Sequence, residues 1–163
     1  MKGFAPGLFD RLMGVGAHAL SSGTVTRLSM EDLKDTVARD LEALLNTRTV
    51  IPEELLKPYP ESSNSIVTYG LNDFAGMSLA STDDRATICR ALEQAIARHE
   101  PRLKNVVASL EVREGSINRL NFAISALLVV HPAQEPVSFD AVLQPSSLQY
   151  SISKTYRSTR TAE

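Results

Sequence analysis

Cysteine, histidine and long apolar runs are all scarce in this sequence of 163 residues. Cys89 is the only cysteine, which excludes a disulfide within the chain and a metal cluster held by several thiolates. No two of the three histidines show a recognised metal-ligand spacing. The longest uninterrupted apolar run, residues 126–130, is far shorter than the roughly 20 residues that a membrane-spanning helix needs. The sequence therefore predicts no metal site, no cofactor and no membrane insertion.

Several functional motifs are absent as well. The sequence has no Walker loop and no Gly-x-Gly-x-x-Gly for phosphate binding, and no Gly-x-Ser-x-Gly turn to carry a hydrolase nucleophile. Its net charge of -2 argues against a dedicated nucleic-acid-binding protein. Residues 1–10 lack the continuous apolar stretch of a signal peptide, so we expect a cytoplasmic protein.

The composition and the length favour a single domain. With 43% hydrophobic and 22% charged residues, the chain can bury one core. We expect this domain over residues 29–153. Residues 1–28, rich in Gly, Ser and Thr, predict a flexible segment with one short amphipathic piece at residues 8–12. The polar residues 154–163 predict a disordered tail.

Two capping boxes mark the starts of two helices. Ser29 and Asp32 have the spacing in which a hydroxyl and an acid satisfy each other's backbone amides. Apolar residues then recur at helical spacing and predict a helix over residues 30–45. Ser81 and Asp84 repeat the box and begin a second amphipathic helix.

The second helix should end at His99 or Glu100, because Pro101 moves its predecessor out of the helical region. Between the two helices, residues 46–80 are interrupted by prolines and glycines and predict a long connection with a helical turn near residues 53–56. A connection of this length is usually functional or packed against the rest of the domain.

In the second half of the chain the apolar period changes from 3.6 to 2, which is typical of strands. The pattern predicts an α+β fold, with N-terminal helices packed on a C-terminal antiparallel meander of about four strands. The longest alternating segment is apolar on both sides, as expected of a central strand. The expected strands cover residues 106–112, 120–130, 137–143 and 148–152, with a hairpin turn at residues 114–116 and a connection at residues 131–136.

The end of the second helix departs from local preference. Glu100 closes a helix whose macrodipole favours cations at that end. Pro101 forces an extended backbone, in which Glu100 and Arg102 point to the same side. Arg102 could then bind a carboxylate with two parallel hydrogen bonds, either from its own chain or from a partner. The simpler interpretation is an ordinary helix stop with solvated charges.

Two further clusters flank the long connection. In Leu-Leu-Asn-Thr-Arg at residues 44–48, Asn46 can adopt the left-handed cap conformation and Arg48 complements the helix dipole. In Tyr-Gly-Leu-Asn-Asp-Phe at residues 69–74, the glycine frees the backbone and Asp73 can fold back onto it. Helix capping explains the first cluster without a functional role, and docking of the connection on the core explains the second.

Four motifs in this order resemble the TssE family of type VI secretion baseplate proteins. This family is related to the baseplate wedge proteins of contractile-tailed phages and was formerly called lysozyme-like. The resemblance covers residues 8–152, almost the whole chain. It is carried by the amphipathic start at residues 8–12, the Leu-Leu-Asn-Thr-Arg run, the Tyr-Gly-Leu-Asn-Asp-Phe turn and the Glu-Pro-Arg signature at residues 100–102.

The resemblance implies a structural, non-enzymatic role in the cytoplasmic baseplate. The partners would be the wedge proteins TssF, TssG and TssK and the sheath subunits TssB and TssC, whose polymerisation the protein would help to start. We expect partner contacts at Glu100, Pro101, Arg102, Arg48, Asp73 and Phe74. We also hypothesise that sheath strands add to an exposed sheet edge at residues 148–152, because an unpaired edge offers backbone hydrogen bonds.

The alternative is a peptidoglycan-cleaving, lysozyme-like enzyme with Glu100 as general acid. Such an enzyme needs two carboxyl groups across a cleft, and Glu100, Asp73 and Glu111 are candidates. The absence of a signal peptide disfavours this function, because the enzyme would reach the cell wall only by injection.

Overall fold

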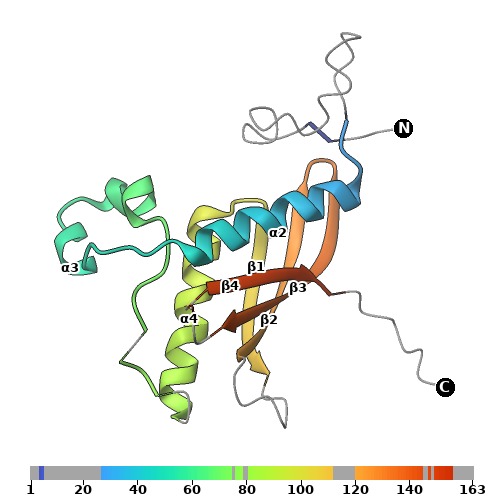
Figure 1. The fold of residues 1–163 in the computed structure, drawn as a ribbon. Coiled ribbons are helices and arrows are strands. Elements are labelled where there is room, and N and C mark those ends of the chain that lie inside the picture. The colour runs from blue at the N-terminus through green and yellow to red at the C-terminus, as the bar shows by residue number, and fades with distance from the viewer. Residues whose placement is uncertain are drawn as a thin grey trace.

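The computed structural model describes residues 4–5, 27–74, 76–78, 81–111, 120–144, 147 and 149–155. Four strands form one antiparallel sheet in the order β1-β2-β3-β4, preceded by the helices, so the expected α+β fold is confirmed (Figure 1). The elements are the α-helices α2 (Met30–Asn46), α3 (Glu53–Leu56) and α4 (Thr82–His99), the 3-10 helices η2 (Pro60–Asn64) and η3 (Ile66–Thr68), and the strands β1 (Leu103–Glu111), β2 (Leu120–Val130), β3 (Ala133–Gln144) and β4 (Gln149–Lys154).

Helix α2 begins at the predicted capping box. The Asp32 amide donates to Ser29 Oγ at 3.1 Å, and the Ser29 amide donates to Asp32 Oδ2 at 3.0 Å. Both halves of the box are therefore made, and two otherwise unpaired amides of the first turn are satisfied.

Only half of the second box forms. The Asp84 amide donates to Ser81 Oγ at 3.3 Å, but the Asp84 carboxylate accepts from the Ser78 amide at 2.8 Å instead of closing back on Ser81. Helix α4 still begins where the sequence predicts and ends at His99, with the Glu100 amide donating to the Ile96 carbonyl at 2.8 Å.

The core lies between the two long helices and one face of the sheet. Helix α2 runs alongside β4, and α4 runs alongside β1 (Figure 1). Strand β2 alternates strictly between buried and half-buried side chains, as its predicted central position requires. Among the most deeply buried side chains are these residues of α2, α4, β1, β2 and β3: Val37, Leu41, Leu45, Leu92, Ile96, Leu103, Phe122, Ile124, Leu128 and Phe139.

Strand β3 begins earlier than expected. The prediction of a connection over residues 131–136 is wrong, because β3 starts at Ala133 and Pro136 pairs with Leu127 in the sheet. Strand β4 covers β3 only from Phe139 onward, and the Thr155 amide extends this pairing to the Ser138 carbonyl at 2.9 Å. Pro136 therefore lies where β3 is an edge, and a missing amide costs nothing there.

Strand β1 also begins before the alternating pattern does. Leu103 pairs with Leu128, whereas the expected strand starts at residue 106. A bulge between Lys104 and Val107, with Asn105 at a φ of 52°, shifts the register and breaks the alternation.

At the other end of the sheet, β4 includes Lys154, one residue beyond the expected domain boundary. Its Nζ lies 2.6 Å from Asp35 Oδ1 and 3.4 Å from Glu31 Oε2 of α2. The predicted amphipathic piece at residues 8–12, the hairpin turn at residues 114–116 and the tail after residue 155 lie outside the described residues.

No helix in the part of the chain that the structure describes is long and apolar enough to cross a membrane. The described residues also contain no group of three or more His, Cys, Asp or Glu side chains placed to hold a metal ion.

Candidate partner-binding site

The two clusters that flank the long connection meet in the structure. Arg48 and Leu71 form a parallel bridge, in which the Leu71 amide donates to the Thr47 carbonyl at 2.9 Å and the Thr49 amide donates to the Leu71 carbonyl at 3.0 Å. We call residues 47–49 and 70–71 the neck, and residues 50–68, which contain α3, η2 and η3, the arm. The neck clamps the two ends of the arm together, and the arm extends from it away from the sheet (Figure 1).

Gly70 allows the neck to close. Its φ is +118°, and a Cβ at this position would lie 2.6 Å from the Thr47 carbonyl oxygen. Any other residue would be strained in this backbone conformation and would push the two segments apart. The predicted role of this glycine, to free the backbone, is confirmed.

The Glu-Pro-Arg signature forms a charge cluster near the neck. Arg102 Nε donates to Glu100 Oε1 at 2.7 Å, Arg102 Nη2 donates to Glu100 Oε2, and the same nitrogen lies 2.5 Å from Asp40 Oδ2 of α2. The prediction that Glu100 and Arg102 point to the same side is confirmed, and Arg102 binds carboxylates of its own chain.

The burial of the cluster decides between the two interpretations of the signature. Glu100 is only 5% exposed, so the helix stop with solvated charges is wrong. Burial by itself would lower the pKa of Arg102, but the hydrogen bonds and charges of Glu100, and then of Asp40, outweigh it and raise that pKa. The guanidinium therefore stays charged and compensates a buried carboxylate, which would be costly to leave unpaired.

Asp40 was not among the expected site residues, although the sequence carries a signal for it. It lies three residues after Val37 and four before Leu44, on the helix face that these buried side chains define. A carboxylate on an apolar face needs a cation nearby, and Arg102 supplies one from 62 positions away.

His99 and Tyr69 connect the end of α4 to the end of the arm. His99 Nε2 lies 3.0 Å from the Thr68 carbonyl oxygen and 3.2 Å from Thr68 Oγ1. The Tyr69 ring contacts the His99 ring edge-on, with the two ring centroids 5.3 Å apart. Burial, with a smaller contribution from the charge of Arg98, lowers the pKa of His99, although the hydrogen bond to Thr68 opposes the shift. Burial, and then the charges of Asp40 and Glu100, raises the pKa of Tyr69.

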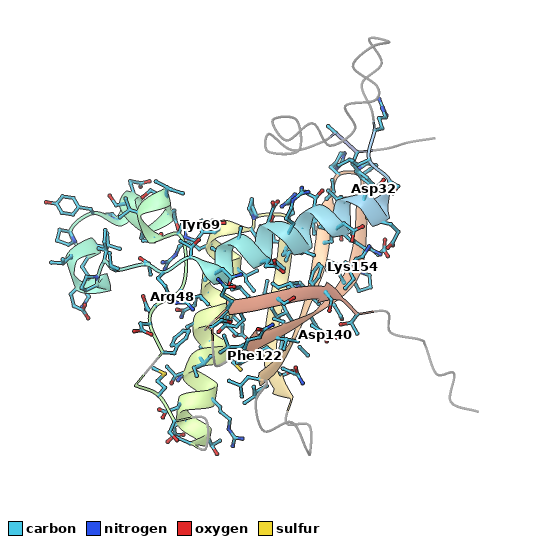
Figure 2. The ribbon with its side chains drawn as sticks, in the orientation of Figure 1. Asp32, Arg48, Tyr69, Phe122, Asp140 and Lys154 are labelled. Atoms are coloured by element: carbon cyan, nitrogen blue, oxygen red, sulfur yellow. The ribbon has the colours of Figure 1, made fainter. Side chains whose placement is uncertain are left out.

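The remaining expected contact residues are Arg48, Asp73, Phe74 and Pro101. Arg48 Nη1 donates to the Leu45 carbonyl at 2.8 Å, so this side chain caps the last turn of α2 as the dipole argument predicts. Phe74 packs against the core, Asp73 and Pro101 lie at the surface, and Figure 2 shows Arg48 and Tyr69 at the base of the arm. The structure therefore joins Arg48 to Leu71 in the neck, and places Glu100 and Arg102 together beside Asp40.

Asn46 does not adopt the predicted left-handed cap. It remains inside α2, and its side chain instead binds the backbone of β4. Asn46 Nδ2 donates to the Tyr150 carbonyl at 2.9 Å, and the Tyr150 amide donates to Asn46 Oδ1 at 2.7 Å. The amide group thus takes the place of a neighbouring strand's peptide.

This contact overturns the hypothesis of an open edge at residues 148–152. Glu42, one turn before Asn46, accepts from the Ile152 amide through Oε2 at 2.9 Å. Two residues four apart on a helix are about 6 Å apart along its axis, close to the roughly 7 Å between alternate residues of a strand. Helix α2 therefore occupies three outward backbone groups that an added strand would need, namely the Tyr150 amide and carbonyl and the Ile152 amide.

The opposite edge of the sheet is closed in the same way. Glu93 of α4 accepts from the Ala108 amide through Oε1 at 2.8 Å, and Cys89, four residues earlier, has a hydrogen bond with the backbone of Leu110. Burial, and then the charge of Glu93, raises the pKa of the Cys89 thiol. Cys89 is thus a structural thiol at the edge of β1.

Glu100 and Glu111, two of the three carboxylates proposed for a lysozyme-like mechanism, are not arranged as a catalytic pair. Both oxygens of Glu100 accept hydrogen bonds from Arg102. Glu100 precedes β1, and Glu111 ends it, so their backbones are roughly 25 Å apart along the strand, against the 5 to 9.5 Å that separates glycosidase carboxyl groups.

Comparison with known proteins points to one family. Residues 31–133, more than half of the chain, match the family model described as baseplate wedge protein gp25. The matched segment contains the arm, the neck, the charge cluster and the first two strands. A search of curated proteins finds no significant match.

Proposed function

The chain belongs to the baseplate wedge protein gp25 family, which includes TssE, and we propose that it is the TssE-type wedge component of a type VI secretion baseplate. The family match over residues 31–133 carries the structural role in a baseplate. The four motifs that resemble TssE, in the same order along this chain, support the type VI assignment.

As such a component, the protein joins TssF, TssG and TssK in the cytoplasmic wedge and helps the sheath subunits TssB and TssC to begin polymerising. It acts by contact and turns over no substrate. The paired state of Glu100 and the distance between Glu100 and Glu111 support this non-enzymatic role.

The geometry also limits how the contacts are made. Side chains of α2 and α4 occupy outward amides of β4 and β1. Where these helices cover β4 and β1, the protein therefore associates through its side-chain surfaces and not by strand addition at the bound amides.

The test is a pull-down of tagged chain from native cytosol, with mass spectrometry of the recovered proteins. We expect TssF, TssG and TssK with the wild type, and we expect cells that lack the chain to form no sheaths until it is restored. Normal sheath assembly in cells without the chain would contradict the proposal. Clearing of a peptidoglycan suspension by the purified protein would instead favour the enzyme.

A further inference from the structure

The arm carries most of the large apolar side chains that the described residues expose. Five of the six lie on it: Val50 at 88% exposure, Ile66 at 78%, Leu55 and Tyr59 at 65%, and Val67 at 42%. The sixth, Val107, lies on β1. Scattered apolar side chains are ordinary on a protein surface, but their concentration on one projecting segment indicates an interaction surface.

Hydrogen bonds within the arm hold its short helical turns together. Ser63 Oγ donates to the Pro60 carbonyl at 2.6 Å, and Ser65 Oγ donates to the Ser62 carbonyl at 2.8 Å. Thr68 Oγ1 donates to the Ser63 carbonyl at 2.8 Å. These bonds hold the backbone of residues 60–68, which carries Ile66 and Val67, and so reduce the backbone entropy that a partner must remove on binding.

The motifs of the site fix the position of the arm. The neck joins the two ends of the arm. His99, at the end of α4, contacts Thr68 in the last turn of the arm. Glu100 is buried and bound to Arg102, so its carboxylate offers no surface to another protein. Glu100 and Arg102 are therefore positioning residues, which join the end of α4 to Asp40 of α2, while the adjacent His99 contacts the arm.

The charge of the arm indicates the charge expected on the surface of its partner. Residues 50–68 contain three acids and one base, Glu53, Glu54, Glu61 and Lys57. Glu54 and Glu61 are exposed beside the apolar side chains. A second copy of this chain would bring acidic arm against acidic arm in a symmetric pair, which like charges disfavour.

We propose that the arm is the element by which this protein docks onto another baseplate subunit, and that this subunit receives it in an apolar groove bordered by Lys and Arg side chains. This inference rests on the proposed function, because it takes the partner to be a wedge protein. It assigns the main contact to residues 50–68, outside the six residues expected from the sequence.

The experiment measures binding of the purified chain to the purified TssF–TssG complex by isothermal titration calorimetry. The test variant combines Leu55→Ser, Tyr59→Ser and Ile66→Ser, and the control is Val107→Ser, which changes an exposed apolar side chain outside the arm. We expect the triple variant to weaken binding at least tenfold, the control to bind as the wild type does, and all proteins to show the same circular dichroism.

A second pair of variants tests the basic border. Glu54→Gln with Glu61→Gln raises the net charge by two on the arm, and Gln134→Lys with Gln144→Lys does the same at exposed positions of β3. We expect the arm pair to weaken binding severalfold and to reduce its dependence on salt, and the β3 pair to leave both unchanged.

The outcomes separate the two proposals. If the wild type binds TssF–TssG and the triple variant binds equally well, the arm is not the docking element, although the proposed function stands. If the wild type does not bind TssF–TssG and the pull-down recovers no wedge protein, the proposed function fails and this inference fails with it. A concentration-dependent dimer that the triple variant loses would overturn the inference in favour of a second copy as the occupant.

Discussion

The edges of the sheet and the arm differ in the chemical groups that they leave to solvent. At β4 and β1, backbone amides that could recruit another strand are bound by Glu42, Asn46 and Glu93. On the arm, the backbone is folded into short turns and the apolar side chains are exposed. Strand edges pair with almost any strand, whereas a side-chain surface selects a shape and a charge. The difference favours association with chosen partners.

The strongest test of this comparison is the charge cluster, which joins the end of α4 to α2. We expect Arg102→Ala to lower the free energy of unfolding by about 3 to 5 kcal/mol, because it leaves Glu100 buried without a counter-charge. Urea denaturation measures the change. Lys104→Ala, at an exposed position two residues away, is the control and should change stability by less than about 0.5 kcal/mol. A loss that small for Arg102→Ala would show that the cluster does not hold the fold.

Gly70 in the neck and Gly76, six residues later, form a matched pair of glycines. Gly70→Ala should cost about 2 to 3 kcal/mol, because its φ is positive and the new Cβ would press on the Thr47 carbonyl. Gly76→Ala meets nothing within 4 Å and should be neutral or slightly stabilising. Hydrogen exchange at the Leu71 amide should accelerate only in the first variant. Equal exchange in both would mean that the neck closes without Gly70.

Removing a side chain that covers the edge of β4 should allow this edge to pair with other strands. Asn46→Ala removes two hydrogen bonds to Tyr150 and should cost about 1 to 2 kcal/mol. It should also produce concentration-dependent self-association, measured by sedimentation velocity, because a backbone edge becomes available. Asn64→Ala, on an exposed arm position, is the control and should remain monomeric. If Asn46→Ala is equally monomeric, a single amide is not what keeps the edge closed.

The smallest expected effect is a pH dependence of the free energy of unfolding, caused by His99 beside the last turn of the arm. Burial lowers the pKa of His99 in the folded state, so the unfolded chain binds the proton first as the pH falls. His99 therefore contributes stability above its unfolded pKa of roughly 6.5, and that contribution is lost as the pH falls through its lower folded pKa. His99→Gln should flatten the slope of unfolding free energy between pH 7 and pH 5. His131→Gln, which removes an exposed histidine elsewhere in the fold, is the control for the substitution itself. An unchanged slope in His99→Gln would show that this histidine does not contribute to the pH dependence of stability.

Local features of the sequence determined the helices, the central strand and the family. The capping box at Ser29, the stop at Pro101 and the alternation over β2 each depend on neighbours a few residues away, so the sequence alone predicts them. The same is true of Gly70 and of the shared side of Glu100 and Arg102.

Only the tertiary structure decided what these elements contact. Asp40 reaches Arg102 across 62 positions, and Asn46 reaches Tyr150 across 104, so no local pattern specifies either pair. Whether Pro136 ends a strand depends on how far β4 extends beside it. Short-range sterics and hydrogen bonds set each element, but packing of the whole chain selects which polar groups lose water together and must therefore pair.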